Sequence, residues 1–127
     1  MVSDVKKVRE VPRFRARLRG EDVFCTVRLE SPDALSVAVE TAATSLKEGL
    51  RAVSKFAGYC ERTLILDSWE EAAWAEVMAS YFGFGLTIAN KGVRCEVMPP
   101  PTSSDSKMTG ARRQFIRRVI EQQEANS

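Results

Sequence analysis

Residues 13–19 alternate strictly between arginine and apolar side chains. Successive side chains of a β-strand point to opposite faces, so this segment fits a strand with one apolar face and one cationic face. We therefore predict a strand over residues 12–19 that places Phe14, Ala16 and Leu18 on its apolar side. The cationic side carries Arg13, Arg15, Arg17 and Arg19.

A second alternating segment follows a short polar turn at residues 20–22. The odd-numbered residues from 23 to 29 are apolar, and Phe24, Thr26 and Arg28 lie between them. Two alternating segments joined by a short glycine-containing turn predict a β-hairpin. We expect its core face to hold residues 23, 25, 27 and 29, and its solvent face to hold the arginines together with Phe24, Thr26 and Arg28.

The next segment predicts a long helix. Residues 31–33 read Ser-Pro-Asp, which is typical of a helix start, and Gly58 is a typical helix stop. Apolar residues between them recur at spacings of four and three, so we predict one helix over residues 32–57. A break near residues 41–44 is the alternative, because β-branched threonines are weak helix formers. Gly49 lies on the apolar stripe, where a missing side chain would let another backbone come close. The stripe consists of Leu35, Val39, Ala42, Leu46, Gly49, Val53 and Phe56.

A strand–helix–strand pattern occupies the second half of the chain. The apolar residues 63–66 predict a buried strand, and Ser68 with Glu71 fits a capping box that starts the following helix. Strands over residues 86–88 and 93–98 complete the pattern, the first through a right-handed parallel crossover and the second as an antiparallel partner. The helix is expected to bury Trp74, Val77, Met78 and Tyr81.

Residues 99–107 are rich in proline and serine and predict a linker. The helix expected after it, over residues 108–124, is amphipathic and basic. Met108, Phe115, Ile116, Val119 and Ile120 form its apolar face, and Arg113, Arg117, Arg118 and Glu121 lie on its polar face. Such a tethered helix is able to fold back on the domain, exchange with a neighbour or dock on another protein.

These elements predict an α+β fold with a single sheet of about five strands in the order β-β-α-β-α-β-β. One long and one shorter helix would cover one face, and the linked C-terminal helix would follow. We divide the chain into a mobile basic leader at 1–11, a core domain at 12–98, the linker and the helix. The expected core is Phe14, Leu18, Val23, Cys25, Val27, Leu35, Val39, Leu46, Val53, Leu64, Leu66, Trp74, Val77, Met78, Ile88 and Val93.

The positions of the charged residues and cysteines indicate the charge of a partner and the cellular location. Residues 1–20 hold seven basic and two acidic side chains, whereas residues 21–100 hold seven basic and twelve acidic ones. A basic end of this kind suggests an anionic partner. None of the three cysteines lies in a Cys-x-x-Cys pair, and Cys25 and Cys95 fall at apolar strand positions, so we expect buried free thiols and a reducing, cytoplasmic location. No apolar run approaches 18 residues, so we expect no membrane insertion.

The sequence offers little catalytic chemistry. It contains no histidine, which removes the commonest general base and metal ligand. It also contains no phosphate-loop, dinucleotide or zinc spacing, so we expect no cofactor, no metal site and no catalytic residues. Cys60 would lie at a helix C-terminus, which raises a thiol pKa and disfavours reactivity. Asp67, Glu70 and Glu71 form an acidic group at a strand end, where a metal or general-base role competes with helix capping.

The arginine face remains the most informative feature for function. Arginine binds phosphates and carboxylates through a planar fork, and alternate strand residues lie about 6.6 to 7 Å apart, close to a phosphate repeat. The partner would be a nucleic acid or an acidic protein surface, while protection of an edge strand and surface solubility are the competing interpretations. We predict a non-enzymatic accessory protein that binds nucleic acid mainly through its phosphates. The alternative is a protein-interaction or assembly module, homodimeric or not, that uses the helix over 32–57 or the C-terminal helix. The predicted nucleic-acid-binding residues are Arg13, Arg15, Arg17, Arg19, Phe24, Arg28, Arg113, Arg117 and Arg118.

Overall fold

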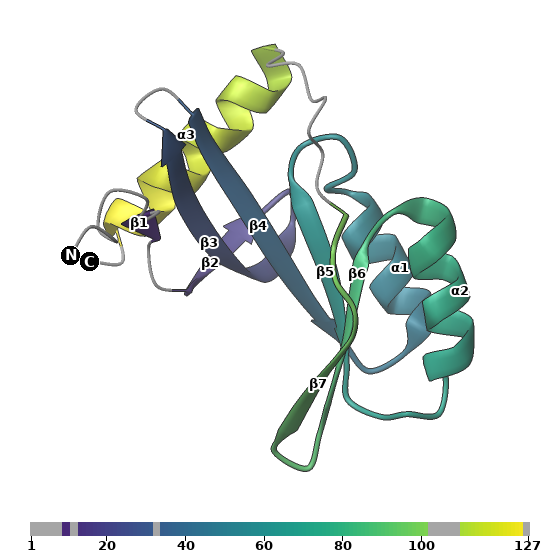
Figure 1. Cartoon of the computed structure of the whole chain (residues 1–127). Helices are drawn as coiled ribbons and strands as arrows, with labels where there is room; N and C mark the ends of the chain where they lie inside the picture. The colour runs from purple at the N-terminus through teal and green to yellow at the C-terminus, as the bar shows by residue number, and fades with distance from the viewer. Residues whose placement is uncertain (1–8, 11–12, 32–33, 102–109, 126–127) are drawn as a thin grey trace, which may run out of the picture.

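A computed structural model describes residues 9–10, 13–31, 34–101 and 110–125 (Figure 1). Along the chain, α1 and α2 lie between strands, and α3 follows the last strand that the structure describes. They are β1 (Arg9–Glu10), β2 (Phe14–Leu18), β3 (Glu21–Ser31), β4 (Ala34–Ala43), α1 (Leu46–Ser54), β5 (Glu61–Leu66), α2 (Ala72–Phe82), β6 (Gly85–Asn90), β7 (Val93–Met98) and α3 (Gly110–Ala125).

The strands form one mixed sheet, which confirms the predicted α+β class. Within the described residues the sheet has seven strands in the order β1-β3-β4-β5-β6-β7, and β2 also pairs with β3. Both β1 and β2 run antiparallel along the same strand β3, one after the other, so Arg9–Glu10 of the expected leader extend the hairpin. The pairs β4–β5 and β5–β6 are parallel, and β6–β7 is antiparallel as predicted.

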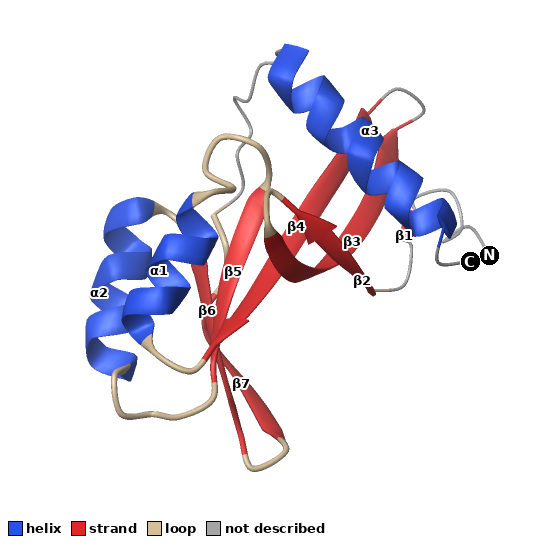
Figure 2. Cartoon of the chain, turned by 180° about the vertical axis from the view of Figure 1, so that it is seen from behind, coloured by secondary structure: helices blue, strands red, loops and turns tan. Residues whose placement is uncertain are grey.

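The three helices in the described residues pack on one face of the sheet, as Figure 2 shows from behind. Beneath the hairpin, α3 contributes Phe115, Ile116 and Val119 to a core that includes Val23 and Cys25. At the other end of the sheet, α1 and α2 cover β5 and β6 and enclose a second core. The opposite face of the sheet has no helix among the described residues.

The predicted helix over residues 32–57 is wrong in its first half. Residues 34–43 form β4, which pairs with β3 on one side and with β5 on the other. Apolar residues in this segment recur both at every second and at every third or fourth position, and pairing to two strands decides in favour of the strand. The helix starts only at Leu46, where the Ser45 side chain accepts a hydrogen bond of 3.3 Å from the Glu48 amide. Residues 32–33, the expected helix start, lie outside the described residues.

The second half of the predicted stripe is confirmed, because Leu46, Gly49 and Val53 are buried on α1. The close neighbour of Gly49 is a side chain rather than a backbone. A Cβ built at Gly49 would lie 2.5 Å from Leu64 Cδ1, so any larger residue at this position would require the Leu64 side chain to move.

The predicted orientation of α2 is wrong. Ala75 and Ala79 are its buried residues, whereas Trp74, Val77 and Tyr81 are exposed and Met78 is half-buried. Small side chains allow a helix to lie close against the sheet, so this helix keeps its large side chains on the outer side. On β7, Val93 of the expected core is also exposed, and so is Cys95, which we expected to be a buried thiol. The remaining expected core is buried, except that Phe14 is half-buried and Leu35 lies at a position whose side chain is not described.

A buried arginine joins the two helices at this end of the sheet. Arg62 on β5 is 8% exposed, and burial lowers the pKa of its guanidinium from the ordinary value. Its Nη1 donates to the Val53 carbonyl at 3.0 Å and its Nη2 to the Phe82 carbonyl at 2.5 Å. Arg62 thereby satisfies carbonyl groups at the C-terminal ends of both α1 and α2.

Candidate nucleic-acid interface

The hairpin presents its arginines much as the alternation predicts. Arg15 and Arg17 of β2 are exposed, while Ala16 and Leu18 between them are buried. The Arg15 and Phe24 positions pair across β2 and β3, so both lie on the open face of the sheet. The Phe24 ring lies beneath two guanidinium groups, with Arg13 Cζ at 3.9 Å and Arg15 Cζ at 5.7 Å from its centroid. The open face therefore has a cationic and aromatic character along β2, and half-buried Arg28 follows on β3.

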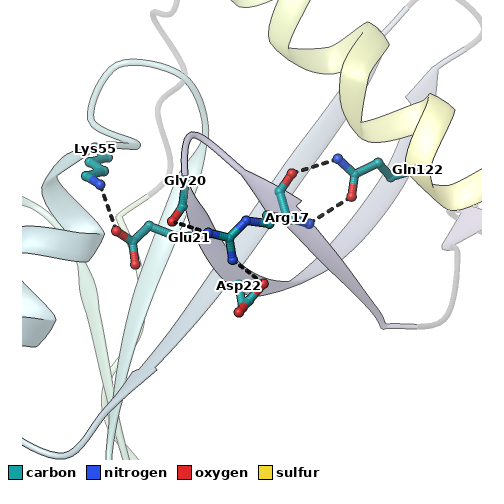
Figure 3. A network of polar contacts seen from close by, with 6 residues as sticks. All are labelled: Arg17, Gly20, Glu21, Asp22, Lys55 and Gln122. Atoms are coloured by element: carbon teal, nitrogen blue, oxygen red, sulfur yellow. Dashed lines mark hydrogen bonds and ion pairs between the residues drawn. The ribbon is translucent and has the colours of Figure 1, made fainter.

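Carboxylates of the same molecule neutralise part of this face. Arg13 Nε lies 2.6 Å from Glu40 Oε1, and Arg94 approaches the other oxygen of the same carboxylate at 3.0 Å. Arg17 Nη1 lies 2.9 Å from Asp22 Oδ1 (Figure 3). The Arg17–Asp22 pair is exposed and weak, whereas Glu40 is half-buried, and each carboxylate offsets the positive potential that a phosphate would meet.

Arg19 leaves the row of arginines because β2 ends at Leu18. The connection is a two-residue turn, in which Arg19 and Gly20 have φ values of 51° and 79°. Positive φ at both residues is the type I′ geometry that fits the twist of a hairpin. The turn is thus Arg19–Gly20 rather than residues 20–22. Arg19 lies over the Tyr59 ring, with Cζ 4.7 Å from the centroid and Nη1 3.4 Å from the hydroxyl.

The C-terminal helix α3 folds back onto its own domain. Phe115, Ile116 and Val119 are buried as predicted, and Arg113, Arg117 and Arg118 are exposed. Figure 3 shows how α3 is anchored on β2: the Gln122 side chain accepts from the Arg17 amide at 2.8 Å and donates to the Arg17 carbonyl at 2.7 Å. One side-chain amide thereby satisfies a backbone donor and acceptor that an edge strand leaves open.

This docking divides the predicted basic surface into two. The open face holds Arg13, Arg15 and Arg17 with Phe24 and Arg28, whereas α3 lies on the covered face. Arg19, Arg117 and Arg118 lie around a groove of about 490 Å³ between the hairpin turn, Tyr59 and α3. Its polar and aromatic lining consists of Arg19, Tyr59, Gln114, Arg117, Arg118 and Glu121. Arg113 is exposed on α3 but does not line the groove.

The groove has an excess of positive charge. Arg117 and Arg118 form no ion pair with a carboxylate in the described ranges, and Glu121 is the acidic side chain among the lining residues. Arg19 is held over an aromatic ring, which positions the guanidinium without supplying a neutralising charge. Sequence reasoning missed Tyr59 because its contact with Arg19 spans 40 residues and no local pattern marks it.

The acidic residues near the start of α2, which the sequence offered as a metal or general-base site, include a helix cap. Glu71 Oε1 accepts a 2.8 Å hydrogen bond from the Leu46 amide, so this carboxylate caps α1 instead of completing the predicted capping box on α2. Ser68 Oγ accepts from the Glu70 amide at 3.4 Å, and α2 begins at Ala72. No group of three or more metal-ligating side chains is present in the part of the chain that the structure describes.

Burial disfavours ionisation of the Cys25 and Cys60 thiols. Burial raises the pKa of Cys25 to about 12, and burial with the nearby Cys25 raises the pKa of Cys60 to about 12. Since the thiolate is the nucleophile, neither thiol is suited to nucleophilic chemistry near neutral pH.

Comparisons with known protein families, with curated proteins and with solved structures found no match to this chain. None of the helices within the described residues combines the length and the apolar character that a membrane span requires. The function must therefore be inferred from the surfaces themselves.

Proposed function

We propose that this chain is a non-enzymatic accessory protein that binds nucleic acid through phosphate contacts in the groove between the hairpin turn and α3. The observation that supports the proposal is the set Arg19, Arg117 and Arg118, which line one groove and lack a carboxylate partner among the described residues. The hairpin face is a weaker candidate than the sequence suggests, because Glu40 and Asp22 already hold two of its arginines.

The physical properties of such a site are specific. Binding through three guanidinium groups gives a slope of about −2 for log K against log salt on single strands, which is a loss of about 20-fold between 50 and 200 mM salt. Phosphate contacts carry no sequence information, so different base sequences should bind with similar affinity.

Fluorescence anisotropy with labelled single- and double-stranded oligonucleotides tests this function at both salt concentrations. The variant R117Q/R118Q removes two groove charges, and R13Q/R17Q removes two charges that are paired with carboxylates. We expect the groove variant to lose about tenfold in affinity at 50 mM salt and to flatten the salt slope by about 1.4 units, while the control loses less than about threefold.

Circular dichroism on both variants verifies that the fold is kept. Equal losses in the two variants would show that net charge, and not the groove, governs binding. The proposed function would be rejected if the wild-type chain bound neither the single-stranded nor the double-stranded oligonucleotide at 50 mM salt.

The alternative of a protein-interaction module loses the two surfaces that the sequence assigns to it. The helix over 32–57 is divided between β4 and α1, and the apolar face of α3 is buried on its own sheet. A protein-association role therefore requires a different surface.

A further inference from the structure

The largest apolar side chains on the surface gather on one helix. Tyr81 is 80% exposed and Trp74 is 65% exposed, and Val77 and Phe82 on α2 are more than half exposed. Trp69, in the loop before α2, is also exposed. The rings of Tyr81 and Phe82 meet edge to face at 4.8 Å. We call this surface the α2 face and define it by Trp69, Trp74, Val77, Tyr81 and Phe82.

The composition of α2 is unusual for a helix that only covers a sheet. Such a helix normally has an apolar inner stripe and a polar outer side. In α2 the buried residues are alanines, the aromatic residues Trp74, Tyr81 and Phe82 are all exposed, and Glu76 is the one charged residue. A helix that is apolar on all sides is typical of a buried position, and aromatic residues are enriched at protein interfaces. The outer side of α2 therefore has the character of an interface.

A small cavity adjoins this face between α1 and α2. It has a volume of about 240 Å³, and its lining is mostly apolar, with Ser54 and the buried Arg62 among Leu50, Val53, Ala57, Phe82 and Phe84. A dry apolar cavity of about 150 Å³ accommodates benzene, so this one is large enough for an aliphatic or aromatic side chain. It provides a place for a single anchoring residue of a partner.

The charges around the α2 face indicate which partner fits. The chain contains no lysine or arginine from residue 63 to residue 90, whereas Asp67, Glu70 and Glu76 are exposed there. A partner bordered by lysine or arginine would be attracted to this rim. A symmetric contact of this segment with a second copy would place the same acidic residues opposite one another, because the segment has no lysine or arginine of its own.

We propose that the α2 face docks a partner protein whose apolar anchors are flanked by basic side chains, such as a basic amphipathic helix. Docking of an amphipathic helix on an apolar groove is a common mode of peptide recognition. Figure 1 shows that α2 and α3 lie at opposite ends of the sheet, so the α2 face is separate from the arginine groove. One molecule then has room for a polyanion at one end and a basic protein at the other.

The tryptophans make this proposal directly measurable. The chain has two tryptophans, Trp69 and Trp74, and both belong to the α2 face. We would titrate a tryptophan-free helical peptide with leucines on one face and lysines elsewhere, and a matched peptide with glutamates in place of the lysines. The basic peptide should shift tryptophan emission to the blue, and the acidic peptide should bind at least tenfold more weakly.

Variants then locate the contact by anisotropy of the fluorescein-labelled basic peptide. Trp74→Ser with Tyr81→Ser should weaken binding at least tenfold, and Glu70→Gln with Glu76→Gln should weaken it about threefold or more. Val93→Ser removes an exposed apolar side chain on β7, outside the face, and should leave binding unchanged.

Three results would overturn the proposal. The first is unchanged tryptophan emission with the basic peptide, and the second is equal binding of the two peptides. The third is a wild-type dimer in sedimentation velocity that the Trp74→Ser, Tyr81→Ser variant dissociates, because this would assign the face to a second copy of the chain. All variants are exposed substitutions, and their circular dichroism spectra check that the fold is retained.

Discussion

Replacing Arg62 with methionine tests whether the buried guanidinium holds α1 and α2 together. The substitution keeps an unbranched apolar stem of similar reach but removes both donors to the Val53 and Phe82 carbonyls. The Val53 carbonyl then keeps its backbone hydrogen bond from the Phe56 amide at 3.2 Å but loses the charged donor, and Phe82 lies at the exposed end of α2.

The expected loss follows from two opposing terms. Hydrogen bonds with a charged partner contribute about 1.5 to 3 kcal/mol each, so the two bonds together contribute about 3 to 6 kcal/mol. Removing the charge also removes its desolvation cost, which the lowered pKa of Arg62 reflects. We expect a net decrease of about 2 to 4 kcal/mol in the free energy of unfolding for Arg62→Met. Arg62→Lys keeps the charge but reaches one carbonyl, so about 1 to 2 kcal/mol is expected.

Urea-induced unfolding followed by circular dichroism measures both variants against the wild type. Arg51→Met on the exposed side of α1 is the matched control and should change stability by less than about 0.5 kcal/mol. An Arg62→Met variant as stable as the wild type would refute the reasoning, because desolvation would then outweigh the two bonds. Equal losses for methionine and lysine would assign the effect to the second hydrogen bond alone.

Two further predictions concern a helix cap and the thiols. Glu71→Ala removes the carboxylate that caps α1, so the free energy of unfolding in urea should fall by about 1 kcal/mol, while Glu70→Ala should change it by less than about 0.3 kcal/mol; similar effects of both would contradict the cap. Burial raises the pKa of Cys25 and Cys60 from 9.0 to about 12, so the unfolded chain ionises them first as pH rises. Between pH 8 and 10 each thiol should lower the free energy of unfolding by up to about 1.4 kcal/mol, and the C25A/C60A variant should lack this decrease. Parallel pH profiles of variant and wild type would contradict it, and at pH 8 a thiol reagent should modify exposed Cys95 alone in the folded chain.

The hairpin could be predicted because the alternation that defines it lies within a short stretch of sequence. Each residue from 13 to 18 alternates in both character and burial, and a two-residue shift would leave the pattern intact while a one-residue slip would bury the arginines. The C-terminal helix α3 was predictable for the same reason, since its buried residues Phe115, Ile116 and Val119 lie within about two turns of the helix.

The first helix could not be separated from a strand by local pattern. Residues 34–43 satisfy both periods, and the decision came from pairing with β3 and β5, which no short segment contains. The wrong helix prediction also affected the predicted nucleic-acid-binding surface. Phe24 pairs with Glu40 across β3 and β4, so this carboxylate lies beside the hairpin arginines only because the segment is a strand.

The orientation of α2 exposes a different limit of sequence reasoning. Hydrophobicity alone directs Trp74 and Val77 inward, but the residues of α2 that are buried against the sheet are Ala75 and Ala79, with Ala72 and half-buried Met78 beside them. Close packing is set by the backbones on both sides, as the approach of Gly49 to Leu64 shows for α1.

The contact of Gln122 with Arg17 also affects the order in which the molecule can fold. These residues are 105 positions apart, so the helix that covers the hairpin is synthesised long after the hairpin itself. At about 5 to 20 residues per second, a ribosome adds residues 30 to 125 in roughly 5 to 20 s. Throughout that interval the nascent hairpin has an apolar underside without its helix, which makes the early chain a natural client for chaperones.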